Sequence, residues 1–357
     1  MFEFDFLKRK FYKNKKVLIT GHTGFKGSWF CRILLNLGAN VTGYSLQPLT
    51  QPDLFSLADV ESKMRSVIGD ICDLQQLQRV FAEAQPEIVF HLAAQPIVRE
   101  SYKDPRYTYE TNVMGTVNVL ECVRQTPSVK SFLNVTTDKV YLNRERAEGY
   151  REDEPLDGFD PYSNSKSCSE LVTHCYKKSI FADGKTAIST ARAGNVIGGG
   201  DFAKDRIIPD CVRAMQAGET IKVRNPHSIR PYQHVLEPLA VYLMIAAWQF
   251  DKGCYAGYYN VGPDNCDCIT TGELAELFCK HWGSEARWES KEEFNAPHEA
   301  NFLKLDCSLL KKTFGWQPRW HIEEAIQKTC AFSKVWLQGG NIPAEMDKEI
   351  DEFFGET

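Results

Sequence analysis

The stretch Val17-Leu18-Ile19-Thr20-Gly21-His22-Thr23-Gly24-Phe25-Lys26-Gly27 decides the fold class of this chain. Four apolar or β-branched residues predict a short strand, glycines follow at GxxGxxG spacing, and residues 26–36 have the pattern of a helix. Glycine permits a tight turn and lets the backbone approach a pyrophosphate, which then lies on the amides and positive dipole of the helix N-terminus. The stretch therefore predicts a dinucleotide-binding turn.

The same alternation continues through the first half of the chain. Strands are expected at residues 17–20, 40–44, 66–68, 88–92, 131–136 and 187–192. Helices are expected at residues 26–36, 74–84, 108–124 and 162–178. Strand and helix in strict alternation predict an α/β fold, a doubly wound parallel sheet of the Rossmann type with helices on both faces.

After Asn195 this regularity is lost among glycines and prolines, and further helices are expected near 207–217, 236–250 and 271–280. We expect a smaller, discontinuous C-terminal lobe that binds substrate. In this division the Rossmann domain, expected to bind the dinucleotide, comprises residues 1–195 and about 235–262. The substrate-binding lobe comprises about 196–234 and 263–357.

Composition excludes several classes of protein. The 357 residues are 43% hydrophobic and 25% charged, and their net charge of -5 gives no general attraction to nucleic acid or to an anionic membrane. The longest apolar run, residues 239–250, is too short to cross a bilayer and predicts a buried helix. Residues 1–16 alternate aromatic and basic side chains without the apolar core of a secretory signal, so we interpret them as an arm packed on the domain.

The cysteines and histidines suggest no metal. The 12 cysteines are scattered without a CxxC pair, which favours reduced thiols in a cytoplasmic protein. Cys266 and Cys268 are a close pair, but no second pair at zinc-ligand spacing accompanies them. We therefore predict no metal site.

The residues after the second and third strands bear on the cofactor. Dinucleotide folds usually carry an acidic residue after the second strand to hold the adenosine ribose, whereas the residues here, 44–47, read Tyr-Ser-Leu-Gln. This turn does not decide between NAD and NADP. Asp70 is placed to contact adenine, and Asp73 is expected to cap the following helix.

The chemical groups are expected at the end of the fifth strand and at the start of the helix that follows it. The strand leads into Thr137-Asp138-Lys139, and a later helix begins with Tyr162 and carries Lys166 one turn on. A tyrosine and a lysine at i, i+4 share one helix face, so the ammonium can lower the pKa of the phenol and make it a usable base. Ligands of open α/β sheets bind at this carboxyl edge.

Several longer motifs give a resemblance to a known family. They are TGHTGFKG at 20–27, HLAAQPIVRESY at 91–102, TNVMGTVNVLE at 111–121, TTDKVY at 136–141, PYSNSKSCSE at 161–170, RAGNVIGGGDFAKDRIIPD at 192–210 and IRPYQHVLEPL at 229–239. With them the chain resembles the extended, nucleotide-sugar-modifying members of the short-chain dehydrogenase/reductase superfamily. Within it, the nearest likeness is to the 4,6-dehydratases that act on CDP-glucose.

The resemblance implies NAD as cofactor and assigns residues to it and to the substrate. The implied cofactor residues are Gly21, Thr23, Gly24, Phe25, Lys26, Gly27, Asp70, Ile71, Leu92, Ala93, Ala94, Tyr162 and Lys166. The implied nucleotide-sugar residues are Gln95, Asn195, Arg206 and Arg230. The two arginines also have support from the chemistry, because a guanidinium binds phosphate through two hydrogen bonds.

The implied reaction is an oxidation, a dehydration and a reduction on one sugar. Thr137 and Tyr162 would contact the 4-hydroxyl, and Asp138, protonated, would give its proton to the departing 6-hydroxyl. Related 4,6-dehydratases commonly carry glutamate where this chain has Lys139, so Lys139 is expected either to remove the C5 proton or to stabilise the enolate. The product would be a 4-keto-6-deoxy sugar nucleotide for surface polysaccharide such as the O-antigen of lipopolysaccharide.

Two other functions remain open at this stage. A nucleotide-sugar C4 epimerase needs the same tyrosine, lysine and NAD, but no acid for a 6-hydroxyl. A non-catalytic NAD-sensing module needs none of the catalytic residues. Members of the superfamily pair through the helices expected here at 108–124 and 162–178, which implies a homodimer or homotetramer. The choice of cytosine as the nucleotide base rests on the resemblance alone.

Overall fold

The central element is a parallel sheet. The computed structural model describes residues 4–291 and 302–355. Seven strands lie in the order β10-β6-β5-β4-β1-β2-β3, and every neighbouring pair is parallel. Their bounds are β1 Lys16–Thr20, β2 Asn40–Ser45, β3 Arg65–Ile68, β4 Ile88–His91, β5 Ser131–Thr137, β6 Ala187–Ala193 and β10 Tyr258–Val261. The predicted doubly wound α/β sheet is confirmed.

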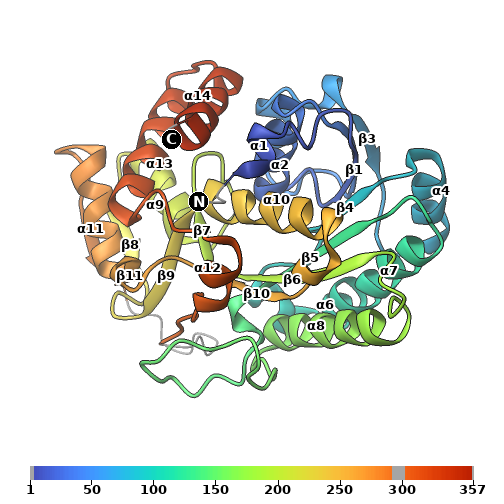
Figure 1. The fold of residues 1–357 in the computed structure, drawn as a ribbon. Helices are drawn as coiled ribbons and strands as arrows, with labels where there is room; N and C mark the ends of the chain where they lie inside the picture. The colour runs from blue at the N-terminus through green and yellow to red at the C-terminus, as the bar shows by residue number, and fades with distance from the viewer. Residues whose placement is uncertain (1–3, 292–301, 356–357) are drawn as a thin grey trace.

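Helices cover both faces of this sheet (Figure 1). One face carries α4 (Leu74–Ala84), α7 (Gly115–Arg124) and α8 (Pro161–Ser179), and the other carries α2 (Phe25–Asn36) and α10 (Leu236–Asp251). Successive side chains of β1 alternate between these layers. Val17 and Ile19 pack in the cluster that contains α2 and α10, whereas Leu18 packs in the cluster with α4 and α7.

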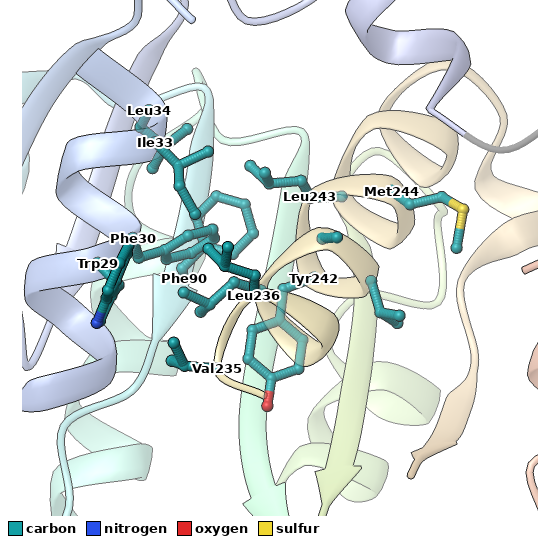
Figure 2. Packing of buried hydrophobic residues seen from close by; sticks show 14 of the residues in the cluster. Trp29, Phe30, Ile33, Leu34, Phe90, Val235, Leu236, Tyr242, Leu243 and Met244 are labelled. Atoms are coloured by element: carbon teal, nitrogen blue, oxygen red, sulfur yellow. The ribbon is translucent and has the colours of Figure 1, made fainter. Parts of the chain in front are cut away.

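The apolar run of the sequence forms the centre of the larger cluster. In α10, residues 239–247 are completely buried. Figure 2 shows Leu236, Tyr242 and Leu243 of this helix facing Phe30 of α2 and Phe90 of β4. The prediction of a buried helix is confirmed, and within the described ranges the structure has no helix that is long and apolar enough to cross a membrane.

Residues beyond β6 build a second group of elements beside the sheet. Its small sheets are β7 (Asn195–Ile197), β9 (Ile229–His234) and β11 (Cys268–Thr270), and β8 (Ile221–Val223) paired with β12 (Trp288–Ser290). Helices α9 (Ile207–Ala217), α11 (Thr271–Trp282) and α13 (Ile322–Leu337) pack around one shared apolar cluster. Chain segments 258–261 and 236–251 lie with the large sheet, as β10 and α10.

The helix expected at residues 108–124 is interrupted. The structure has α6 (Pro105–Tyr109), a π-helical turn at Glu110–Met114, and then α7. Inside the turn, the Asn112 amide donates to the Gln95 carbonyl and to Ser165 Oγ, and Thr116 Oγ1 donates to the Asn112 carbonyl. The Thr116 hydroxyl supplies a donor to the Asn112 carbonyl, and the Asn112 side chain ties the turn to Gln95 and Ser165. We attribute the wider π-helical turn to these bonds.

Sequence periodicity did not indicate the 16-residue helix α13, nor the elements that complete the chain. They are α1 (Asp5–Lys8), α3 (Leu54–Leu57), α5 (Val98–Lys103), α12 (Ser308–Phe314), α14 (Ile342–Gly355) and the 3-10 turns Glu61–Lys63, Asp138–Val140, Gly253–Tyr255 and Asn265–Asp267. Except for α14, each helix among them has seven residues or fewer, too few for a helical period to stand out.

The N-terminal arm packs on the domain, as interpreted from the sequence, although residues 1–3 lie outside the described ranges. Phe4, Phe6 and Tyr12 are all buried, and Tyr12 donates a hydrogen bond of 2.6 Å to the Leu243 carbonyl in α10. Phe4 also makes an edge-to-face contact with Phe353 of α14, so the two ends of the chain lie together.

Candidate active site

The glycine turn between β1 and α2 has no room for side chains. Gly21 has φ of 79°, and a Cβ there would lie 2.7 Å from the Ala93 nitrogen; a Cβ on Gly27 would lie 2.1 Å from the Gly21 carbonyl oxygen. Gly24 is the N-cap of α2 and offers no side-chain cap, so the first amides of the helix keep their capacity to bind an anion. The turn fits the pyrophosphate of a dinucleotide.

Other predicted cofactor residues surround this turn. Ala93 donates from its backbone nitrogen to Thr20 Oγ1 at 3.2 Å, which holds residues 92–94 after β4 directly beside Gly21. Thr23 donates to the Leu46 carbonyl and lies 2.9 Å from Ser45 Oγ, so its side chain joins the turn to the end of β2, where dinucleotide folds usually place an acid.

The predicted adenine residues follow β3. Asp70 accepts a 2.9 Å hydrogen bond from the Cys72 nitrogen and Tyr44 donates to the Asp70 carbonyl, while Ile71 is buried in the apolar cluster under α7. Asp73 accepts from the Gln76 nitrogen at the start of α4. The prediction that Asp73 caps this helix is confirmed.

The predicted catalytic residues come together at the carboxyl edge of the sheet. Asp160 caps α8 by accepting from the Ser163 nitrogen, and Pro161 begins the helix, which sets the position of Tyr162 one residue on. The Thr137 hydroxyl acts on the Tyr162 phenol more strongly than any other polar group does. Lys166, one turn along the same face, donates to the Val135 carbonyl at 3.2 Å.

The pKa of Tyr162 differs from the expectation. Burial raises it to about 12, and the Thr137 hydroxyl and the nearby charge of Arg206 oppose the shift without overcoming it. Burial also lowers the pKa of Lys166 to about 8. The sequence argument considered only the attraction between ammonium and phenolate, whereas removal of both groups from water dominates here.

Asp138 has the environment of a carboxylic acid. It is 1% exposed, Thr137 Oγ1 donates to its Oδ1 at 2.9 Å, and its Oδ2 is buried without a hydrogen-bond partner. Burial raises its pKa, opposed by the positive charges of Lys139, Arg230 and Lys26. A protonated Asp138 can donate through Oδ2 to a group that enters the site.

Three cations from separate elements face this carboxyl group or its neighbours. Arg230 of β9 and Lys26 of α2 both act on Asp138, and Arg206, just before α9, is ion-paired with Asp201 at 2.9 Å. Burial and the charges of Arg206 and Lys166 lower the pKa of Lys26 to about 8. The charged side chain of Lys26 facing the chemical centre is a feature that the sequence analysis missed, because it treated Lys26 as part of the glycine turn.

The remaining predicted substrate residues differ in how available they are. Asn195 begins β7 directly after Gly194, where a Cβ would lie 3.3 Å from Asp138 Oδ2. Gln95 is buried, and its amide donates to the Ile97 carbonyl and to Thr108 Oγ1. Because its two amide protons are engaged by Ile97 of the same loop and by Thr108 of α6, the side-chain amide of Gln95 has no free donor for the expected nucleotide-sugar contact.

The cysteines match the prediction of reduced thiols, since all 12 are free. In the described ranges, Cys266, Asp267 and His321 bring three possible ligand atoms within 4.8 Å of one another. Asp267 accepts from the Ile322 nitrogen and lies 2.9 Å from His321 Nδ1. These contacts explain the group as the anchor of the first turn of α13, and we assign no metal to it.

Comparisons with known proteins agree with this geometry. Residues 18–329 match the family model described as GDP-mannose 4,6 dehydratase. The chain is 44% identical to the CDP-glucose 4,6-dehydratase of Salmonella typhimurium over 98% of this chain and 99% of that protein. Among solved structures, its fold is similar to a dTDP-glucose 4,6-dehydratase from Streptomyces venezuelae with NAD bound (TM-score 0.77, 23% identity, 91% of this chain and 98% of that one). It is also similar to a UDP-glucose 4-epimerase from Thermotoga maritima (TM-score 0.76, 22% identity, 90% and 99%).

The two solved structures are too distant in sequence to show more than the fold. The family model and the Salmonella relative span nearly the whole chain, including the glycine turn, the Tyr162–Lys166 pair and the Thr137-Asp138 dyad. The chain belongs to the GDP-mannose 4,6 dehydratase family, the nucleotide-sugar-modifying group that its sequence motifs indicated.

Proposed function

We propose that this protein is a hydro-lyase that converts CDP-D-glucose to CDP-4-keto-6-deoxy-D-glucose with tightly held NAD. Asp138 is the observation that carries this assignment. A 4,6-dehydratase needs an acid for the departing 6-hydroxyl, and Asp138 is buried, has a raised pKa and keeps one oxygen without a partner. The 44% identity to a CDP-glucose 4,6-dehydratase supports the choice of cytidine as the base.

The residues that would hold NAD are those of the glycine turn, residues 92–94 beside it, Asp70 and Ile71 after β3, and Tyr162 with Lys166. The fit rests on the space that the absent side chains of Gly21 and Gly27 leave, and on the uncapped amides of α2. When bound, NAD supplies a hydride acceptor for the sugar C4 and returns the hydride to C6.

Tyr162 and Thr137 orient and deprotonate the sugar 4-hydroxyl. Both lie at the carboxyl end of β5, where the Thr137 hydroxyl acts on the Tyr162 phenol. The Lys166 ammonium lies on the same helix face, and its positive charge favours the phenolate that removes the proton. Asp138 then donates its proton to the leaving 6-hydroxyl, because its environment favours the protonated form before the reaction.

Lys139 has two possible tasks, removal of the C5 proton or stabilisation of the enolate. It lies in the 3-10 turn after β5, half-buried and facing Asp138. Solvent deuterium separates the two tasks. If Lys139→Ala incorporates deuterium at C5 as fast as the unaltered protein, Lys139 is not the base.

Substrate diphosphate would be held by Arg206 and Arg230, with Asn195 close to the reacting end. Arg230 is 6% exposed on β9 and acts on Asp138, and Arg206, just before α9, acts on Tyr162. Two guanidinium groups match the two phosphates of a nucleotide-sugar.

Self-association is part of the proposal. Tyr107 of α6, Met114 of the π turn and Leu171 of α8 are 38%, 52% and 52% exposed. Contiguous helices with exposed apolar side chains favour pairing of two copies through this face as a homodimer, or a homotetramer built from it. We also propose a cytoplasmic location, which agrees with 12 free thiols.

The test is a direct one. Purified protein is incubated with NAD and CDP-glucose, and the product is analysed by mass spectrometry. We expect a nucleotide-sugar lighter by one water; an unchanged mass with altered stereochemistry at C4 would indicate an epimerase, and recovery of CDP-glucose alone would contradict both activities. Parallel reactions with UDP-glucose and dTDP-glucose test the base.

A further inference from the structure

A buried carboxylate lies directly behind the catalytic residues. Glu170 of α8 is 0% exposed and comes one helical turn after Lys166, so Tyr162, Lys166 and Glu170 follow one another along the same face. Its Oε1 accepts from Thr136 Oγ1 at 2.5 Å, and its Oε2 accepts from Thr190 Oγ1 at 2.8 Å. One side chain thus connects α8 to β5 and β6.

The charge of Glu170 is compensated by an equally buried arginine. Arg192 of β6 is 0% exposed and donates from Nη2 to Glu170 Oε2 at 3.0 Å. Its Nη1 donates to Tyr141 Oη at 2.7 Å and to the Glu152 carbonyl at 3.0 Å. Both terminal nitrogens of the guanidinium are thus hydrogen-bonded, while Nε is buried without a partner. A buried ion pair of this kind is costly to break, because either partner alone would be an uncompensated charge.

The contact with Thr136 reaches the catalytic strand. Thr136 precedes Thr137, which donates to Asp138 and acts on the Tyr162 phenol. On the other side of Thr136, the Val135 carbonyl accepts from Lys166 Nζ. Side chains of successive strand residues point to opposite faces, so fixing Thr136 toward α8 fixes Thr137 toward the reacting groups. Glu170 is therefore placed to set the register between the strand and the helix that carry the chemistry.

Glu170 also faces the Lys166 ammonium. Burial lowers the pKa of Lys166, and Glu170 opposes that shift. Lys26 from α2 is a cation near Lys166, and His91 from β4 is buried and neutral, with its pKa lowered to about 3.

Around Glu170 itself lie three further polar side chains besides Arg192. His174 Nε2 of α8 lies 3.3 Å from Glu170 Oε2. The other two are Tyr258 and Tyr141, whose hydroxyls are close enough for the Glu170 charge to act on them. Arg192 holds the pKa of Glu170 down to about 2, against the effect of burial, so the carboxylate is ionised wherever the enzyme is folded.

We propose that Glu170 is a positioning residue of the catalytic site, which fixes Thr137 beside Tyr162 through Thr136 and places a negative charge one helical turn from Lys166. The inference rests on the proposed function, since it assigns Glu170 a task in that reaction. The Lys166 titration distinguishes this role from that of a purely structural ion pair. A purely structural pair would affect stability but not the titration of Lys166.

The experiment compares Glu170→Gln with Glu170→Asp. The glutamine removes the charge but keeps the size, so the pKa of Lys166 falls and the alkaline limb of the pH-rate profile moves to lower pH by about one unit. The aspartate keeps the charge and should leave that limb in place, with a lower rate from the altered contact to Thr136. Tyr141→Phe is the matched control, because it removes a hydrogen bond to Arg192 without changing the charge that faces Lys166. The alkaline limb of its pH-rate profile should not move.

Two additions keep the test decisive. If Glu170→Gln does not fold because Arg192 is left unpaired, the double variant Glu170→Gln/Arg192→Gln removes both charges, and the same downward shift is expected since Glu170 is the nearer. The pKa of Lys166 is also read without turnover from the NMR signal of carbon-13-labelled lysine, assigned by its loss in Lys166→Met. An unshifted Lys166 titration overturns the inference, whereas a shifted titration in a protein that does not convert CDP-glucose overturns only the proposed function.

Discussion

Thr137 Oγ1 donates a 2.9 Å hydrogen bond to Asp138 Oδ1, and this leaves Asp138 Oδ2 buried without a partner. The two residues are neighbours in sequence at the point where β5 becomes a 3-10 turn. The Thr137 hydroxyl also acts on the Tyr162 phenol, so it lies between the proposed group that deprotonates the sugar and the proposed group that protonates its leaving hydroxyl.

Asp138→Asn should stop the dehydration. Asparagine has nearly the same shape but cannot transfer a proton, and loss of a general acid lowers the rate by about 10²–10⁴-fold. The loss is measured as the rate at which the product lighter by one water forms. Asp153→Asn, which removes a carboxylate that is 77% exposed, serves as control and should leave the rate unchanged.

The same substitution should stabilise the fold. Because the pKa of Asp138 is raised in the folded protein, ionisation of this group favours the unfolded chain at any pH above the ordinary value of about 4. Asparagine removes this penalty, and we expect stability at neutral pH to rise by about 1 kcal/mol, or about 1–2 °C in Tm for a chain of 357 residues. The gain should disappear as the pH falls toward 4; a variant less stable than the parent at pH 7 would contradict the raised pKa.

Activity should depend on the charge of Lys166. With a pKa of about 8, the ammonium is lost as the pH rises through that value, so the rate should fall on the alkaline side. Lys166→Arg keeps a positive charge at every accessible pH. Its absolute rate should be lower, because the guanidinium does not fit the Val135 contact, but its alkaline limb should be absent. A limb that persists unchanged in the arginine variant would assign it to another group.

Sequence reasoning recovered the features that are local in the chain. The glycine turn, the pairing of Tyr162 with Lys166 and the cap at Asp73 each depend on residues within one or two turns of each other, where spacing determines geometry. The six predicted strands all lie in the central sheet within one or two residues of their expected bounds.

Features that depend on distant segments were not accessible in the same way. The seventh strand, Tyr258–Val261, is four residues long and gains its place by pairing with β6. The pKa of Tyr162 was expected to fall and instead rises, because its value depends on burial by the whole fold. Gln95 was assigned to the substrate by its motif, but its donors are used by Ile97 and Thr108, a contact set that no spacing rule reveals.

Arg206→Met should weaken substrate binding more than turnover. Arg206 is held by Asp201 and reaches the Tyr162 side of the site without contacting Asp138. Removal of a charged hydrogen-bond donor to phosphate costs about 1.5–3 kcal/mol, so KM for CDP-glucose should rise about tenfold to a hundredfold. Arg65→Met is the control. It breaks an exposed ion pair between Arg65, at the start of β3, and Glu83, and it should leave KM unchanged. A fall in kcat at constant KM would contradict a binding role.

Gly21→Ala should abolish tight NAD binding. A Cβ at this position would approach the Ala93 nitrogen to 2.7 Å, and φ of 79° is unfavourable for alanine by about 1–2 kcal/mol. The turn must therefore move away from residues 92–94, and we expect NAD affinity, measured by isothermal titration calorimetry, to fall at least about tenfold. Gly184→Ala is the matched control: Gly184 has φ of 70°, and a Cβ there meets nothing within 4 Å. It should incur the same backbone penalty in Tm but leave NAD affinity intact. If both variants lose NAD affinity equally, backbone strain explains the loss, and the close approach of Gly21 to residues 92–94 does not.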